Sequence, residues 1–184
     1  PGDPTSPTNQ LRAEHRQIEA ILNALETQLS SETPAWAWRQ DCLDFLRGFA
    51  DGVHHHKEEE ALFPRLAARG IPEEGGPIGV MLYEHDLGRE CMQNMAEALV
   101  VAKLDSVEAD RQFRAAARQY LVLLRQHIMK EDQVLFMMGE QVLSEADQTG
   151  LRQAFAKADA LPVKGRQRQE YLDLAARIQA EVLA

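Results

Sequence analysis

Six side chains that can bind a metal ion stand at helical spacing in this sequence: His15, His54, Glu58, His85, His127 and Glu131. Each glutamate follows a histidine by four residues, which places the pair on one helix face, about 6 Å apart along the axis. All four histidines stand on apolar stripes where Leu or Ile would be expected. Burying four imidazoles costs desolvation free energy, and a metal ion offsets that cost by using their lone pairs. Imidazole with carboxylate is the ligand set of non-haem iron and manganese, whereas thiolate-rich sets favour zinc or clusters.

The spacing alone leaves two choices of register open. The stretch His54-His55-His56-Lys57-Glu58-Glu59-Glu60 contains three His-x-x-x-Glu pairs, and the apolar positions upstream favour the third, His56 with Glu60. In the later pair, Asp132 is an alternative to Glu131, but the spacing of four residues favours Glu131.

Apolar residues recur every three or four positions along almost the whole chain, and no window alternates as a strand would. We therefore predict an all-α protein: an up-down-up-down four-helix bundle with two additional C-terminal helices. The expected long helices cover about 11–30, 35–68, 78–99 and 106–138, and the shorter ones 144–160 and 165–183. The predicted organisation is a flexible N-terminal arm over 1–10, the bundle over 11–142 and a helical extension over 143–184, packed on the bundle.

The composition of the chain argues against several classes of protein. The 184 residues include 20 Lys and Arg against 29 Asp and Glu, a formal charge of −9, which argues against a nucleic-acid groove or an anionic membrane surface. No stretch approaches the roughly 20 apolar residues of a membrane span. Two cysteines, Cys42 and Cys91, are too few for a disulfide scaffold, so we expect a reduced, soluble, cytoplasmic protein.

Four stretches together resemble the hemerythrin-like (HHE cation-binding) family. They are EHRQIEAIL around His15, HHHKEEEALFP at 54–64, GPIGVMLYEHDLGR at 76–89 and HIMKEDQVLF at 127–136, and they span about two thirds of the chain. The resemblance implies two iron ions bridged by Glu58 and Glu131 and by an oxo or hydroxo group, with the four histidines as terminal ligands. Zinc or manganese is a substitute for iron. Alignment on Leu62-Phe63-Pro64 selects His54 with Glu58 from the three pairs.

The sequence departs from the oxygen-carrying members of the family. Those carriers have a second histidine one turn after the histidine of the third helix, where this chain has Arg89, and their pattern in the fourth helix resembles His-x-x-x-x-Asp, which would select Asp132. Four histidines leave an open coordination position on each ion, which favours reactivity over oxygen carriage. Candidates for a further ligand or a supporting hydrogen bond are Glu84, Tyr83, His55 and Glu19, although a surface position is the favoured interpretation of each.

The resemblance implies a non-haem di-iron protein that senses or reacts with O2, NO or peroxide, its partner being that small diatomic or peroxide ligand. The alternatives are a di-iron enzyme that consumes peroxide or NO or repairs iron centres, and a metal-binding bundle of zinc or manganese without a redox role. The C-terminal helices are expected to cover the bundle, with a lid over the site or a homodimer surface as alternatives.

Overall fold

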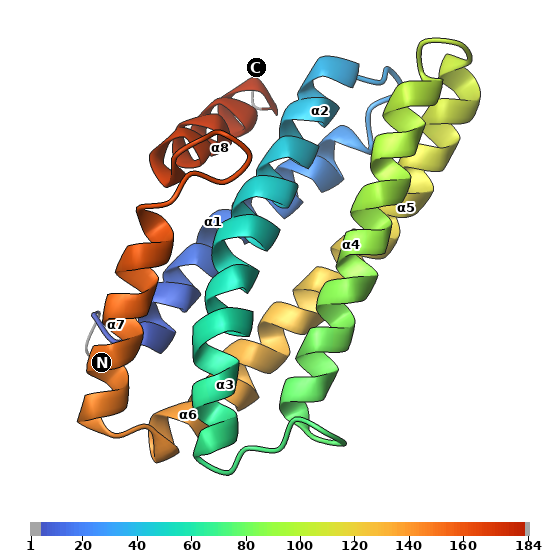
Figure 1. Cartoon of the computed structure of the whole chain (residues 1–184). Coiled ribbons are helices and arrows are strands. Elements are labelled where there is room, and N and C mark those ends of the chain that lie inside the picture. The colour runs from blue at the N-terminus through green and yellow to red at the C-terminus, as the bar shows by residue number, and fades with distance from the viewer. Residues whose placement is uncertain (1–4, 183–184) are drawn as a thin grey trace.

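The computed structural model describes residues 5–182, which form helices joined by short turns and contain no β-strand (Figure 1). Four long helical rods make the bundle. They are α1 (Pro7–Gln28); α2 (Trp36–Phe45) continued by π-helical segments Leu46–His55 and Glu58–Leu62 into α3 (Phe63–Ala68); α4 (Pro77–Val101); and α5 (Ser106–Lys130) continued by π-helical segment Glu131–Leu135 into α6 (Phe136–Val142). The predicted all-α four-helix bundle is confirmed.

Local sequence signals explain where the rods begin. The Ser6 side chain accepts a hydrogen bond from the Asn9 backbone N–H, and Pro7 occupies the first turn, where its missing N–H is not needed. Asp105 caps α5, because its side chain accepts hydrogen bonds from the backbone N–H groups of residues 107 and 108. The expected arm over 1–10 is wrong from Pro7 onward, because those residues are helical; residues 1–4 lie outside the described range.

The two additional C-terminal helices are also confirmed. They are α7 (Glu145–Asp159), which begins with a reciprocal Ser144–Asp147 capping box, and α8 (Arg168–Val182). Both pack along one flank of the bundle, α7 against α1 and the second rod, and α8 against α1 and α2 (Figure 1). The extension therefore covers two of the four rods and leaves α4 and α5 uncovered by it.

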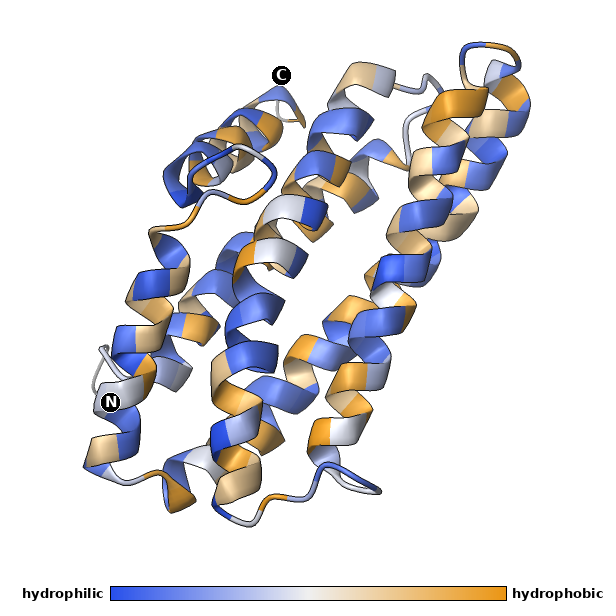
Figure 2. Ribbon diagram, in the orientation of Figure 1, coloured by the Kyte–Doolittle hydropathy of each residue, from blue (hydrophilic) through white to orange (hydrophobic). Residues whose placement is uncertain are grey.

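Two hydrophobic clusters fill the interior, one toward each end of the bundle. On α1, Leu11 belongs to one cluster and Ile18 to the other, with His15 between them. The same order recurs on α4, where His85 lies between Met81 and Met92. Figure 2 shows hydrophobic and hydrophilic residues alternating in short blocks along the rods, as in amphipathic helices. The histidines thus form a polar layer that interrupts an otherwise apolar core.

Within the described residues, no helix has both the length and the hydropathy that crossing a lipid bilayer requires.

Candidate metal centre

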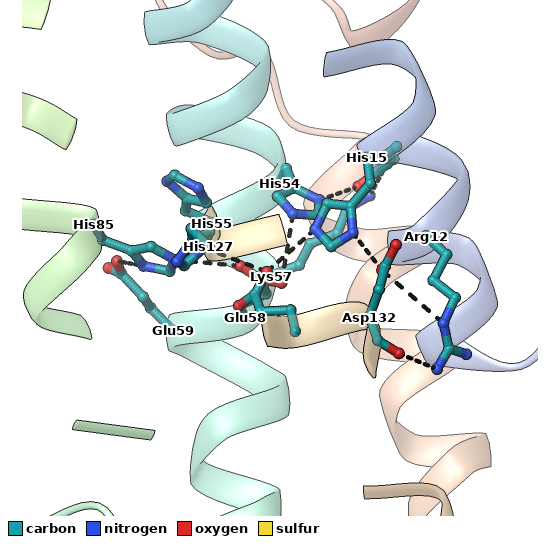
Figure 3. A network of polar contacts seen from close by, with 12 residues as sticks. Arg12, His15, His54, His55, Lys57, Glu58, Glu59, His85, His127 and Asp132 are labelled. Carbon is teal, nitrogen blue, oxygen red and sulfur yellow. Dashed lines mark hydrogen bonds and ion pairs between the residues drawn. The ribbon is translucent and has the colours of Figure 1, made fainter. Parts of the chain in front are cut away.

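The six predicted ligands meet in this polar layer, one histidine from each rod and one glutamate from each of the second and fourth rods (Figure 3). Each glutamate contacts the Nε2 atoms of two histidines. The contacts are His54 to Glu58 Oε1 (3.4 Å), His85 to Glu58 Oε2 (3.5 Å), His15 to Glu131 Oε2 (3.2 Å) and His127 to Glu131 Oε2 (3.3 Å). All six side chains are buried. The sequence-predicted residues therefore converge on one point.

His55 joins this cluster as a fifth imidazole. Its side chain is only 3% exposed, and its ring stacks on that of His85 with the centroids 3.8 Å apart. The favoured interpretation of His55 as a surface residue is therefore wrong. His56 and Glu60 are exposed, which removes them as the metal-binding pair.

The backbone explains how adjacent histidines both face inward. In a regular α-helix, neighbouring side chains point about 100° apart. The stretch Leu46–His55 is π-helical, with wider turns that change the angle between successive residues, and such segments are common at functional sites. Another π-helical segment begins at Glu58 and a third at Glu131, so each bridging candidate starts one.

The inward donor atoms fall into two groups, in each of which the candidate ligand atoms lie within 4.8 Å of one another. One group is His15, His54, Glu58 and Glu131, and the other is His55, His85, His127 and Glu58. Glu58 belongs to both, so a carboxylate stands between two adjacent cation positions. Neither carboxylate oxygen of Glu58 or of Glu131 has a hydrogen-bond donor, nor has Nε2 of His15 or His54. Buried polar atoms without partners are costly, and a cation at each position would satisfy them, so the residues fit a pair of metal ions.

The electrostatics of the cluster point the same way. Burial and the nearby Glu131 carboxylate raise the pKa of Glu58 well above its usual value. Burial alone would raise the pKa of Glu131 too, but the charges of His127 and His15 beside its carboxylate lower it well below the usual value. Burial and the proximity of His15 lower the pKa of His54 to about 4. The buried cluster therefore holds protons on some of its imidazoles and carboxylates, and bound metal ions would take the place of these protons.

A ring of outer carboxylates holds four of the imidazoles from behind. Each histidine uses Nδ1 toward a carboxylate, which can only accept, so Nδ1 carries a proton and Nε2 is the atom that a metal ion at the centre would meet. The bonds are His15 to Asp132 (2.7 Å), His54 to Glu14 (3.1 Å), His85 to Glu59 (2.6 Å) and His127 to Glu84 (3.1 Å). Every such carboxylate is the chain neighbour of an inward ligand on its own rod and serves a histidine of the next rod. Since adjacent residues diverge by about 100°, a neighbour of an inward residue faces the adjoining rod.

A cation then neutralises each outer carboxylate. Lys57 donates to Glu14, Arg89 to Glu59, Lys130 to Glu84 and Arg16 to Asp132. Arg89 stands where oxygen carriers have their extra histidine, and its guanidinium also donates to Asp51 at 2.8 Å. Asp51 Oδ1 lies 3.5 Å from Nδ1 of His55, and that nitrogen has no hydrogen-bond partner, so the fifth imidazole lacks the short carboxylate bond that holds the other four.

The other residues that the sequence offered as ligands or supporting groups occupy different positions. Glu84 makes the supporting hydrogen bond that the sequence offered as one option, whereas Tyr83 is exposed and Glu19 pairs with Arg16 at 2.9 Å. Asp132 lies behind His15, outside the two groups of candidate ligands. Sequence reasoning missed Glu14 entirely and offered Glu59 only as the carboxylate that follows His55 by four residues. Their only sequence signal for a supporting role is a position next to an inward ligand.

A helical bundle whose core carries five histidines and two carboxylates, with an outer carboxylate behind four of the histidines, has the arrangement of a metal-binding protein. The family model of the hemerythrin HHE cation binding domain matches residues 6–139, and the chain belongs to that family. The match covers all four long rods nearly to the end of α6 and leaves out the extension. Comparison with curated protein sequences finds no match.

Proposed function

We propose that this chain is a non-haem di-iron protein of hemerythrin type that senses or reacts with O2, NO or peroxide. The observation that carries the proposal is the pair of donor groups joined by Glu58, whose two buried oxygens lack hydrogen-bond partners, as does Nε2 of His15 and of His54. Five imidazoles and two carboxylates favour iron over ions that prefer thiolates or oxygen donors alone. Iron bound there would supply reversible one-electron chemistry.

The two positions differ in the ligands that the chain offers. The His55 group provides three imidazoles and Glu58, whereas the His15 group provides two imidazoles and two carboxylates. Each group offers four protein ligands, so both positions leave room for a small ligand. A phenylalanine ring lies on each side of the centre, Phe136 on His15 with the centroids 5.5 Å apart and Phe63 on His85 at 5.8 Å, and these apolar surroundings suit an uncharged diatomic molecule.

This role fits a cytoplasmic protein, because Cys42 and Cys91 are both free thiols. Carriage, sensing and turnover share one metal centre and differ in the fate of the bound ligand. One experiment therefore distinguishes the proposed function from its two alternatives. These are an enzyme that consumes peroxide or NO, and a zinc or manganese bundle without a redox role.

The test is anaerobic loading with Fe(II), metal analysis, and absorption spectra before and after addition of O2, NO or peroxide. We expect about two iron ions per chain and new near-ultraviolet charge-transfer absorption on oxidation. Catalytic loss of peroxide or NO would favour the enzyme, and reversible spectra a sensor or carrier. Iron-loaded protein whose spectrum none of the three reagents changes would contradict a redox role, and tighter binding of zinc would then favour the non-redox alternative.

The adjacent histidines supply a matched pair of variants for the fifth ligand. His55→Ala removes a buried imidazole of the cluster, whereas His56→Ala removes an exposed one on the same turn. We expect His55→Ala to weaken metal binding and shift the absorption, and His56→Ala to leave both unchanged. Equal behaviour of the two variants would exclude His55 as a ligand.

A further inference from the structure

The cations behind Glu14 differ in burial and origin from those behind the other three outer carboxylates. Arg89, Lys130 and Arg16, the cations behind three of the outer carboxylates, are each at least one third exposed, and all belong to the bundle. Behind Glu14, the cation Lys57 is only 2% exposed, and a second cation, Arg168, comes from the start of α8. Arg168 lies outside the residues that match the family model.

The contacts form a continuous chain from the extension to the metal centre. Glu14 Oε2 accepts from His54 Nδ1 at 3.1 Å, and its Oε1 accepts from Lys57 Nζ at 2.7 Å. The same Oε1 accepts from Nη2 and Nε of Arg168 at 3.0 and 3.2 Å. Asp159, at the end of α7, lies 2.5 Å from Lys57 Nζ and 3.4 Å from Arg168 Nε. Both helices of the extension thus contribute to the support of one histidine.

Charge balance makes these contacts mutually dependent. Glu14, Lys57, Asp159 and Arg168 carry two negative and two positive formal charges, and burial of charges is tolerated only when they are paired. Phe155 of α7 covers Lys57, with its ring centroid 5.7 Å from Nζ, and excludes water from the pair. The low-dielectric surrounding of the buried Glu14–Lys57 pair strengthens its hydrogen bond, whereas Arg168 and Asp159 are partly exposed.

We propose that helices α7 and α8 are an integral part of the metal centre, in which Arg168 and Asp159 are positioning residues that fix Glu14 and thereby the orientation of His54. The inference rests on the proposed function, since it assumes that His54 binds a metal ion. It makes the two metal positions unequal: the bundle alone supports the His55 group, whereas the His15 group depends on the extension. The extension therefore sets how tightly the metal at the His15 and His54 position is held.

The test compares Arg168→Met with Arg166→Met in protein loaded with Co(II), whose visible spectrum reports the coordination geometry. Arg166 lies two residues before Arg168, in the connection that leads into α8, and is similarly exposed, 40% against 31% for Arg168, but its carboxylate partner is Asp44 at 3.8 Å. We expect Arg168→Met to release one of its two Co(II) ions to a chelator about tenfold faster and to change the spectrum, since outer partners of ligating histidines typically contribute 10–100-fold in affinity. Arg166→Met should match the parent protein, and Arg168→Lys should restore part of the loss.

Asp159→Asn is a milder second variant, which keeps the side-chain volume and removes the charge beside Lys57; we expect a smaller acceleration of the same ion. Parental release rates and spectra in both Arg168→Met and Asp159→Asn would overturn the inference and leave α7 and α8 as a cover. Equal effects of Arg166→Met and Arg168→Met would overturn it as well, because the loss would then reflect a loosened loop. If the parent protein binds two ions and the variants release them at the parental rate, only this inference is contradicted. If the parent protein binds no metal, the proposed function is contradicted too.

Discussion

Glu131 and Asp132 are chain neighbours with different positions at the centre, and their amide variants give a sharp test of it. Glu131 is fully buried, and its Oε2 lies 3.2 and 3.3 Å from the Nε2 atoms of His15 and His127. Asp132 is 18% exposed and accepts from Nδ1 of His15 at 2.7 Å, on the far side of that ring. The structure thus places Glu131 among the candidate ligands and Asp132 behind the His15 ring.

The geometry sets the expected magnitudes. Asp132→Asn keeps a carbonyl oxygen that can still accept from His15, so we expect a loss of metal affinity near tenfold, about 1.4 kcal/mol, the lower end for an outer partner. Glu131→Gln replaces a ligand oxygen by an NH2 group that cannot bind a metal ion. We expect that loss to exceed about 100-fold, or 2.7 kcal/mol, the upper end of the same range. Both amides match the parent side chains in volume, so the bundle should stay folded.

The assay is equilibrium competition for Co(II) or Fe(II) against a chromophoric chelator, followed by metal analysis of the dialysed protein. Circular dichroism of each metal-free variant checks that the helices persist. Glu131→Gln should retain fewer metal ions than the parent, while Asp132→Asn retains both at low chelator concentration. Loss of metal in Asp132→Asn with full binding in Glu131→Gln would refute the assignment and restore Asp132 as the ligand.

Two further outcomes are expected from the same structure. Burial lowers the pKa of His127, but Glu131 and other groups raise it to about 9. Metal binding near pH 7 should therefore release a proton from this imidazole, and metal affinity should rise with pH up to about 9. Titration calorimetry in buffers of different ionisation enthalpy measures the proton release, and heats near pH 7 that do not depend on the buffer would contradict the expectation. Because this pKa is raised above 6.5, its contribution to the stability of the metal-free protein is full below pH 6.5 and is lost as pH rises through about 9. Gly48→Ala would drive a methyl group into the ring of buried Tyr171 on α8 and should lower the free energy of unfolding in urea by about 1–3 kcal/mol. Gly150→Ala, which meets no atom closer than 3.9 Å, is the control, and equal unfolding midpoints would contradict the packing argument.

Periodicity in the sequence was sufficient for the helices, because an amphipathic helix buries one stripe and the stripe repeats every three or four residues. It also located an inward histidine on the first, third and fourth rods, since His15, His85 and His127 interrupt apolar stripes. On the second rod, the resemblance to the family was needed to select His54 from three consecutive histidines. These features depend on contacts within one helix, where spacing along the chain fixes geometry.

His55 shows where that reasoning fails. Its inward position depends on a π-helical segment, and the regular α-helical angle between neighbours would direct only one of two adjacent histidines into the core. The sequence offered the three consecutive histidines as alternative registers of a single pair, whereas the tertiary structure places both His54 and His55 inside and His56 at the surface.

The contacts of the outer carboxylates and of the C-terminal extension could not be predicted from the sequence. Glu14 supports a histidine 40 positions away, and Arg168 reaches Glu14 across 154 positions. Such contacts arise only when separate rods pack side by side, because neither charge periodicity nor local spacing encodes which carboxylate meets which cation. The sequence by itself determined the helices, their buried faces and the six first candidates for ligands. Only the tertiary structure decided the fifth imidazole, the carboxylates behind the ligands and the attachment of the C-terminal helices to His54, since each of these requires residues brought together by packing.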